Sequence, residues 1–415
     1  MKLRLRNSAL VAVGVSLLFA ASMTSPVPPA GARPATGDLL SLNSSAATSG
    51  PVGVTPAQIR SKYGYNKAVA DGNGKAVTGT GQTIAIIVPG RDAYAKYELG
   101  DFITHFRLTA MKGLGTATCN PAGYEQEPCF RQVTSGGATG QPSKVEYEEI
   151  ALDIEWAHVA APGANITLVQ EPASPTVHDA DAAIQVAAKL APIVSMSWYK
   201  SGMTAADASS WDELDAAFIS GEGDLGYPET TYPAADPNVL SVGGTDIVTH
   251  PGQEWAWTDT GGGITTNARP GYQLNWTSTT NREVNDVSYN AVRYPIEMSA
   301  PRFPLEWYTV AGVSAGIPQW AGIIARADQV RATEDKPGLA GEGVMAGLYL
   351  AAGQNEGSGK INPAYFHDIT RGCAYGAAAR PKAPCVKRAR AGYDPLTGLG
   401  SPKVGGLVSY LGYDL

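Results

Sequence analysis

The chain has 415 residues, a net charge of −7 and only 17% charged residues. No cluster of basic residues stands out, which argues against a nucleic-acid partner, and we interpret the mildly basic segment 380–390 as a solvated loop. This length is enough for one large α/β domain or two smaller ones.

The first 32 residues have the pattern of a secretory signal peptide. A basic start precedes an apolar run from Ser8 to about Thr24, and Ala30-Gly-Ala32 offers small residues for cleavage. An uncleaved membrane anchor is the alternative, but the apolar run is short for a bilayer span. We therefore expect a secreted, extracellular protein with no membrane contact after signal cleavage.

Residues 33–54 are rich in small and polar residues without hydrophobic periodicity, which predicts a disordered linker or a short propeptide remnant. Thr55 followed by Pro56 predicts a helix start, because Thr is a good N-cap and Pro suits the first helical position. We expect a single folded domain to occupy residues 55–415.

Strand and helix patterns alternate beyond this point. The strands are predicted at Thr83–Val88, Asn165–Gln170, Ile193–Trp198 and Val239–Gly244, and the helices at Tyr94–Phe106, Val145–Ala160, Asp179–Leu190 and Ala206–Ile219. Such alternation indicates an α/β fold with a mainly parallel sheet and helices on both faces. Ligand sites in these sheets lie beyond the carboxyl ends of the strands. The Gly/Thr/Asn-rich segment 261–281 is expected to be irregular and to line a substrate cleft.

The four cysteines form two close pairs, Cys119/Cys129 and Cys373/Cys385. An even number in an exported chain indicates disulfides, and local pairing is the simplest of the three possible connectivities. Zinc binding is the weaker alternative, because neither pair has the short C-x-x-C spacing.

Two sequence features carry the candidate chemistry. Glu149 and Asp153 lie four residues apart in a predicted helix, so they share one face with about 5–6 Å between their Cβ atoms. Ser314 lies in the small-residue turn Gly312–Pro318. A serine nucleophile needs an adjacent base, and a carboxylate can serve in acid, where histidine would be charged. The two features together indicate an acid-adapted serine hydrolase.

Each candidate residue also has an ordinary alternative. Glu149 and Asp153 could belong to a solvated helix face, Asp224 could be a turn residue, and Ser314 could cap a helix. A histidine-based triad is disfavoured, because none of the five histidines lies in a glycine-rich turn or at a strand end; His158 is the least implausible.

Five motifs taken together resemble the sedolisin family of serine-carboxyl peptidases, in its kumamolisin-like form. They are Glu149-x-x-x-Asp153, Gly223-Asp224, Tyr232–Thr245, Gly261-Gly-Gly263 and Gly312-Val-Ser-Ala315. The resemblance runs from about Thr55 to the C-terminus. It implies a subtilisin-like, doubly wound sheet of seven strands. It also implies a monomeric, secreted endopeptidase that cleaves protein or peptide substrates at acid pH.

The resemblance assigns a role to each of four residues. Ser314 matches the nucleophile and Glu149 its general base. Asp153 matches the carboxylate that orients Glu149 and shares its proton, and Asp224 matches the oxyanion-hole aspartate. Physical chemistry agrees, because two neighbouring carboxyls cannot both ionise easily and a protonated carboxyl can donate to an oxyanion.

The resemblance also implies one structural calcium ion near the C-terminus. Its ligands would be the carboxylates of Asp368 and Asp394 and the backbone carbonyls of Ile369, Arg390 and Gly392. Ligation by oxygen atoms alone is what Ca²⁺ prefers. A pair of aspartate-containing turns without a metal is the alternative.

Three departures from the family pattern leave other functions open. Val313 precedes the serine where the family usually has Thr, and Val88-Pro-Gly90 stands where some relatives carry Glu. The large prosegment of the family is also expected to be missing, so the domain from Thr55 should fold and act without one. A catalytically silent, calcium-binding scaffold and an esterase that uses the same serine remain the alternatives.

Overall fold

The computed structural model describes residues 43–415 except 68, 116–118, 120–126, 354–358 and 377–383. The predicted signal peptide and the first part of the predicted linker therefore lie outside the described residues. Within the described part, no helix is both long enough and apolar enough to cross a membrane.

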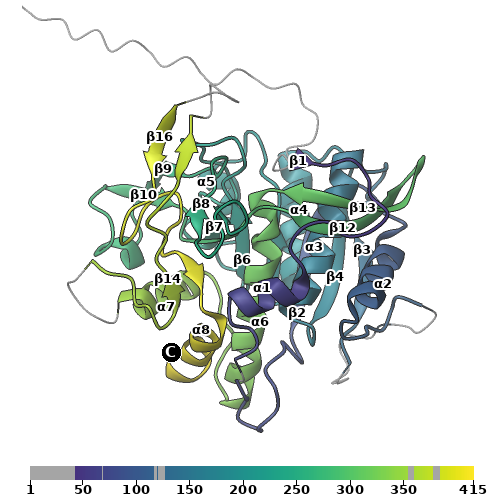
Figure 1. Ribbon diagram of the computed structural model, residues 1–415, viewed down its shortest axis with the longest axis horizontal. Helices are drawn as coiled ribbons and strands as arrows, with labels where there is room; N and C mark the ends of the chain where they lie inside the picture. Colours follow the sequence, from purple (N-terminus) through teal and green to yellow (C-terminus); the bar gives the residue numbers. More distant parts are fainter. Residues whose placement is uncertain (1–42, 68, 116–118, 120–126, 354–358, 377–383) are drawn as a thin grey trace, which may run out of the picture. The chain divides into compact units, whose positions relative to one another are not determined.

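A parallel sheet of seven strands lies at the centre of the described residues (Figure 1). Neighbouring strands are all parallel along the order β11-β7-β6-β5-β2-β4-β3, and a short strand, β8 (Trp255–Ala256), adds to β7 in the antiparallel sense. The expected α/β class and the seven parallel strands are confirmed. In sheet order the strands are β11 (Val287–Asn290), β7 (Val239–Asp246), β6 (Ala217–Gly221), β5 (Ile193–Met196), β2 (Thr83–Pro89), β4 (Asn165–Glu171) and β3 (Phe130–Thr134).

Helices cover both faces of this sheet. On one face lie α3 (Lys144–Ala160) and α6 (Ile317–Thr333), and on the other lies α4 (Val177–Leu190). Strand β2 shows how the pleat divides the core, because Ile84 and Ile86 join the α3/α6 cluster while Ala85 and Ile87 join the α4 cluster. Both faces of the strand are therefore apolar, as expected for a parallel sheet covered on two sides.

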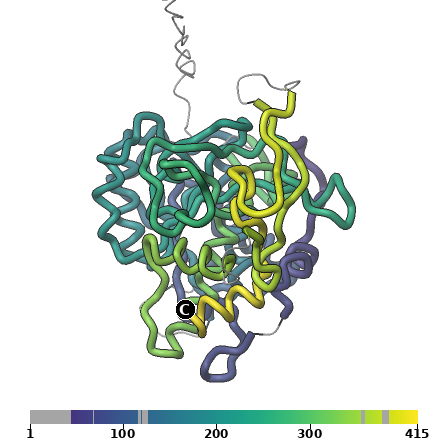
Figure 2. The backbone as a smooth tube through the Cα atoms, turned by 90° about the vertical axis from the view of Figure 1, so that its left-hand side faces the viewer, coloured from purple at the N-terminus to yellow at the C-terminus, as the bar shows by residue number. Residues whose placement is uncertain are grey.

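The remaining elements surround this core (Figure 2). Helix α2 packs on α3, and strands β12 and β13 form an antiparallel pair of which β12 lies against α3. The other elements are α1 (Pro56–Lys62), α2 (Ala95–Phe106), α5 (Ala205–Ala208), α7 (Glu342–Gly353), α8 (Val404–Ser409), β1 (Asn43–Ser44), β9 (Gly263–Ala268), β10 (Asn281–Val284), β12 (Tyr294–Ala300), β13 (Phe303–Ala311), β14 (Phe366–His367), β15 (Cys373–Tyr375), β16 (Cys385–Arg388), β17 (Ser401–Pro402), η1 (Gly271–Gln273), η2 (Val313–Ala315) and η3 (Tyr410–Asp414).

Two of the predicted elements are wrong. The helix expected over Ala206–Ile219 is the short α5 followed, after a gap, by strand β6, because a brief apolar run does not reveal its period. The segment 261–281, expected to be irregular, contains β9, η1 and the start of β10, which pairs with β9. In β9 buried and exposed residues alternate, as in a strand with one covered face. Because most of its residues are Gly, Thr and Asn, the sequence shows no alternation of apolar and polar residues.

The described part of the predicted linker is ordered along an edge strand. Strand β1 pairs antiparallel with β13, and the backbone N–H of Thr48 donates to the carbonyl of Trp307 at 2.8 Å. These contacts satisfy backbone groups on the side of β13 that faces away from β12. Such groups need hydrogen-bond partners whether or not the pairing segment has a periodic side-chain pattern. Thr55 caps α1 as expected, with its side chain accepting from the N–H of Gln58 at 3.2 Å.

Helix α3 is buried on all sides although it carries many ionisable side chains. It lies between α6, α2 and β12, and α6 comes so close that a Cβ atom on Gly322 would lie 2.6 Å from the Cβ of Ala160. Only glycine allows this approach without a shift of one helix. The buried ionisable side chains of α3 are Glu146, Glu148, Glu149, Asp153, Glu155 and His158.

Burial of Glu149, Asp153 and Glu155 makes folding stability depend on pH. Glu155 is fully buried and accepts from the backbone N–H of Glu297 at 3.1 Å, and burial raises its pKa well above the ordinary value. Above about pH 4.3 an unfolded Glu155 ionises while the folded one stays neutral, so the free energy of unfolding falls as the pH rises.

We expect the melting temperature of the wild type to fall between pH 4 and pH 8, and to fall less steeply in Glu155→Gln. The amide cannot titrate but can still accept from the N–H of Glu297. Glu213→Gln, at an exposed position, is the matched control and should keep the wild-type slope. Thermal denaturation followed by circular dichroism gives the melting temperature of all three proteins at each pH. An equal fall of the melting temperature with pH in Glu155→Gln and the wild type would contradict the argument.

Candidate active site

Four residues predicted from the sequence come together where α3, β6 and the start of α6 meet. Ser314 lies in η2, directly before α6, and η2 contacts both α3 and β6. Glu149 and Asp153 lie on one face of α3, and Asp224 follows the carboxyl end of β6. Interactions with Ser314, Asp153 and Asp224 all act on the pKa of Glu149, so the four groups share one site.

Asp224 is held next to the serine by the backbone. Its Oδ1 atom accepts from the N–H of Val313 at 2.8 Å. The turn after β6 depends on Gly223, whose φ of +99° favours glycine and brings the chain back toward η2. The carboxyl of Asp224 thus lies beside the residue that precedes Ser314.

The carboxyls of Glu149 and Asp153 form a buried pair. Burial raises the pKa of Glu149 well above its ordinary value, and the nearby charge of Asp153 raises it further. Burial also raises the pKa of Asp153 to about 8, against a smaller lowering by the hydroxyl of Ser197, which donates to Oδ1 at 2.7 Å. Such a pair retains a proton in solutions where exposed carboxyls have lost theirs.

Ser314 faces Glu149 without a formed hydrogen bond. Its hydroxyl partly offsets the rise in the pKa of Glu149, yet the Ser314 Oγ and both Glu149 oxygens have no partner within normal hydrogen-bond geometry. Hydrogen bonds of catalytic groups are often loose until substrate binds. The structure disfavours two of the three ordinary alternatives, because the carboxyls of Glu149 and Asp153 are buried rather than solvated and the Ser314 side chain caps no helix.

The histidine considered from the sequence takes no part in this site. His158 is fully buried near the end of α3, and its Nε2 atom lies 2.7 Å from the carbonyl oxygen of Thr109. Burial lowers its pKa to about 4. The carboxyls, rather than His158, are therefore the groups placed to act on Ser314.

Sequence reasoning missed Ser197, which orients Asp153. It follows β5 directly, at the carboxyl end of the sheet where ligand sites are expected. Its position near the end of the predicted strand could therefore have marked it as a candidate site residue.

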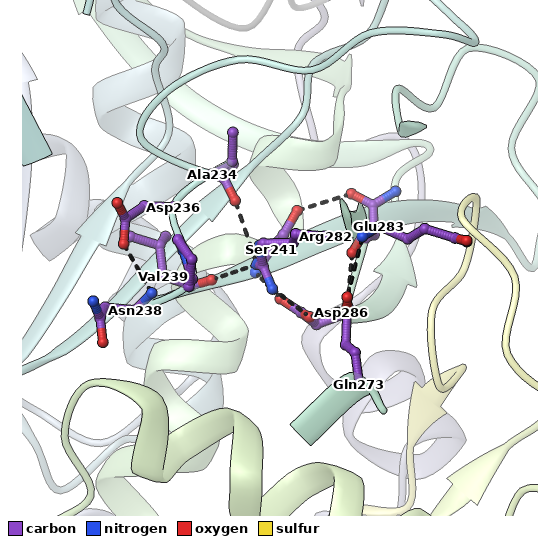
Figure 3. Close-up of polar contacts among 12 residues, drawn as sticks. Ala234, Asp236, Asn238, Val239, Ser241, Gln273, Arg282, Glu283 and Asp286 are labelled. Atoms are coloured by element: carbon purple, nitrogen blue, oxygen red, sulfur yellow. Dashed lines mark hydrogen bonds and ion pairs between the residues drawn. The ribbon is translucent and has the colours of Figure 1, made fainter. Parts of the chain in front are cut away.

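A second group that the sequence did not reveal is the buried ion pair of Arg282 and Asp286 (Figure 3). The Nη2 atom of Arg282 lies 2.7 Å from the Oδ2 atom of Asp286 and donates to the carbonyl of Val239 at 2.9 Å. The pair thereby connects β10 to β7, and β10 is paired with β9, which begins in the triple-glycine motif.

That segment is linked to the Asp224 turn by a chain of hydrogen bonds. The side-chain amide of Asn285, next to Asp286, donates to the carbonyl of Gly261 at 3.0 Å. The N–H of Gly261 in turn donates to the carbonyl of Gly223 at 2.8 Å. The triple-glycine motif and the Asp224 turn are thus one connected structure.

The residues expected to bind calcium also lie together. The N–H groups of Gly392 and Arg390 donate to the carboxylates of Asp368 and Asp394, each at 3.0 Å, so one segment joins both carboxylates. No hydrogen bond from another described residue ends on the carbonyls of Ile369, Arg390 or Gly392.

Two carboxylates and three carbonyls without hydrogen-bond donors are a donor set that suits a hard cation. Among the described residues no cluster of three or more His, Cys, Asp or Glu side chains could hold a metal, so this site would depend on its carbonyls.

Both cysteine pairs are disulfides, as local pairing predicts. Cys119 is joined to Cys129, and Cys373 to Cys385. The second bond connects β15 to β16, which lead into the segment that joins Asp368 and Asp394. With all four cysteines bonded, zinc ligation by thiolates is excluded.

No family model matches the chain. Kumamolisin from Bacillus sp. (strain MN-32) is 28% identical over 415 aligned positions, which cover 89% of this chain and 65% of that protein. A probable tripeptidyl-peptidase SED3 from Arthroderma benhamiae is 29% identical over 191 positions, or 41% of this chain and 30% of that protein. The chain thus spans 65% or less of the length of these relatives.

A solved structure has the same fold. Pseudomonas sedolisin, a serine-carboxyl proteinase in complex with two molecules of pseudo-iodotyrostatin, matches with a TM-score of 0.67 over 89% of this chain and 100% of that chain. At 19% identity this match supports the fold alone. The sequence similarity to kumamolisin therefore supports a sedolisin-like family, and the fold is that of sedolisin.

Proposed function

We propose that the chain is a secreted, monomeric serine-carboxyl endopeptidase that cleaves protein or peptide substrates at acid pH. The observation that carries this proposal is the buried carboxyl of Glu149, which faces the Ser314 hydroxyl and interacts with both Asp153 and Asp224. Pseudomonas sedolisin, which has the same fold, is a serine-carboxyl proteinase, and this supports the same chemistry. The two disulfides are consistent with an oxidising, extracellular location.

The proposed reaction is acyl transfer. The Ser314 oxygen attacks the peptide carbonyl while Glu149 takes its proton, and the protonated Asp224 donates a hydrogen bond to the oxyanion. Glu149 then gives the proton to the leaving amine, and water releases the acyl group by the same steps in reverse. Asp153, held by Ser197, keeps Glu149 oriented and shares the remaining proton of the pair.

Two observations favour the catalytically silent scaffold as the second candidate. Ser314 is fully buried, so a peptide must displace the groups that cover it before attack can occur. Val313, in place of the usual Thr, contributes only its backbone N–H to the Asp224 contact. Activity measurements separate the two candidates directly.

We expect cleavage of a denatured protein substrate to be confined to acid solution and abolished in Ser314→Ala. Glu149→Gln should lose nearly all turnover, because an amide cannot accept the serine proton. The measurement is the rate of peptide release between pH 2.5 and pH 8, with acyl esters assayed in parallel to detect an esterase. A loss of less than about tenfold in Glu149→Gln would contradict the base assignment. A folded wild type that is inert at every pH would favour the scaffold.

Asp224→Ala should lower kcat by about a hundredfold or more, as expected for loss of one oxyanion donor. Asp224→Asn should keep more activity, because its amide oxygen can still accept from the N–H of Val313 while its NH₂ group donates to the oxyanion. Steady-state kinetics at the acid optimum tests both variants. Equal activity of the two would argue against a donor role.

We further propose that Asp368, Ile369, Arg390, Gly392 and Asp394 bind one calcium ion that stabilises the fold. Chelation in mildly acid buffer should lower the melting temperature by several degrees, because the ion binds the folded state alone. Asp394→Ala should also lower it, but Asp394 accepts from Leu396 and Thr397 as well, so its loss destabilises with or without metal.

Asp368→Asn is therefore the sharper variant, and its melting temperature should no longer respond to added calcium. Elemental analysis of freshly purified wild type provides the independent measurement. Protein without bound calcium, and with a melting temperature indifferent to chelator, would rule the site out.

A further inference from the structure

A cavity of about 490 Å³ is lined by residues of α1, α6 and α8 and by residues 65–67, 69–70, 74 and 76–78. Three cationic side chains reach it: Arg60 from α1, Lys67 from the segment that follows, and Arg326 from α6. None of the described residues that line this cavity is an Asp or Glu. The cavity is therefore positively charged and has no acidic lining to balance it.

This cavity is separate from the candidate active site. Ser314 lies just before α6, whereas Arg326 lies twelve residues further along the chain, about 18 Å at the rise of an α-helix. Figure 1 shows α1 and α8 beside the lower half of α6. None of the four candidate catalytic residues lines the cavity.

Arg326 is buried, and no Asp or Glu of the described residues forms an ion pair with it. Its Nε donates to the carbonyl of Ala160 at 2.6 Å and its Nη1 to the carbonyl of Val77, and its guanidinium lies 5.1 Å from the ring centre of Tyr65. The Nη2 atom is buried and has no hydrogen-bond partner. Burial lowers the pKa of Arg326 to about 10, and the charge of Arg60 acts in the same direction.

The second arginine is also unsatisfied. The Nε atom of Arg60 is buried without a hydrogen-bond partner, while Lys67 is exposed at the same cavity. Asp71 lies in the neighbouring loop, but it is occupied by the side chain of Gln329 at 2.9 Å and by two backbone N–H groups. Buried donors and charges left without partners are costly, so a partner from outside the chain would stabilise this arrangement.

We propose that this cavity binds a small oxyanion, a sulfate, phosphate or carboxylate group, between the guanidinium groups of Arg60 and Arg326. Guanidinium groups present paired N–H donors that match such oxygens, and Lys67 adds a mobile positive charge at the edge. The inference does not depend on the proposed peptidase function, because it concerns a different part of the fold.

The test is calorimetric titration of the full-length protein at pH 6 with sodium sulfate and, separately, sodium acetate, at constant ionic strength set with chloride. We expect saturable binding of at least one of the two anions and a matching rise in melting temperature. Arg60→Gln should weaken that binding at least tenfold. Binding of sulfate alone identifies an inorganic-type oxyanion, and binding of acetate alone identifies a carboxylate.

Lys189→Gln is the matched control, because it removes one positive charge from an exposed position on α4. It should bind the anion as the wild type does. Lys67→Gln, at an exposed position, should weaken anion binding severalfold. This variant tests the proposal even if Arg60→Gln does not fold. Absence of saturable binding, or equal weakening in Lys189→Gln and the cavity variants, would overturn the proposal and leave the arginines a purely structural role.

Discussion

Burial of helix α3 from Glu146 to Ala160 is the constraint on which the rest of this structure depends. Carboxyl groups removed from water favour their neutral forms, so the pKa values of Glu149, Asp153 and Glu155 all rise. The same burial costs stability as the pH rises, because the unfolded carboxyls ionise while the buried ones stay neutral. One packing arrangement therefore sets both the protonation of the α3 carboxyls and the pH dependence of folding.

Helix α6 is the partner that makes this burial possible. Its glycine at position 322 lets the two helices approach, and its N-terminal end presents Ser314 to the carboxyls of α3. Further along α6, Arg326 donates to the carbonyl of Ala160 at the C-terminal end of α3. A cation at that end is favourable because helix carbonyls there are unsatisfied. The serine and the cationic cavity therefore lie toward opposite ends of one helix pair.

Asp224 depends on a different support, the ion pair of Arg282 and Asp286. Buried pairs contribute to stability only when their remaining donors and acceptors are satisfied. Here the N–H of Ser241 and the hydroxyl of Tyr349 also donate to Asp286, each at 2.9 Å. Only the Nε atom of Arg282 in this pair has no hydrogen-bond partner among the described residues. The rigid group they form fixes Asn285 and, through the triple-glycine segment, the turn that carries Asp224. The Asp224 turn is thus supported by contacts other than those that bury the α3 carboxyls.

What the sequence by itself determined was local. Hydrophobic runs predicted most strands of the sheet, Thr55 and Pro56 predicted the start of α1, and the spacing of Glu149 and Asp153 placed them on one helix face. Motif order further predicted that Ser314 and Asp224 would join them.

Tertiary structure alone decided the rest, because it depends on contacts between residues far apart in the chain. The pairing of β1 with β13 ordered a segment that has no periodicity. Residues 217–219, the end of a predicted helix, instead became the start of β6, which pairs with a strand on each side. Ser197 gained its role only when β5 was placed beside α3. Arg60, Lys67 and Arg326 share no local pattern, and folding alone collects their charges around one cavity.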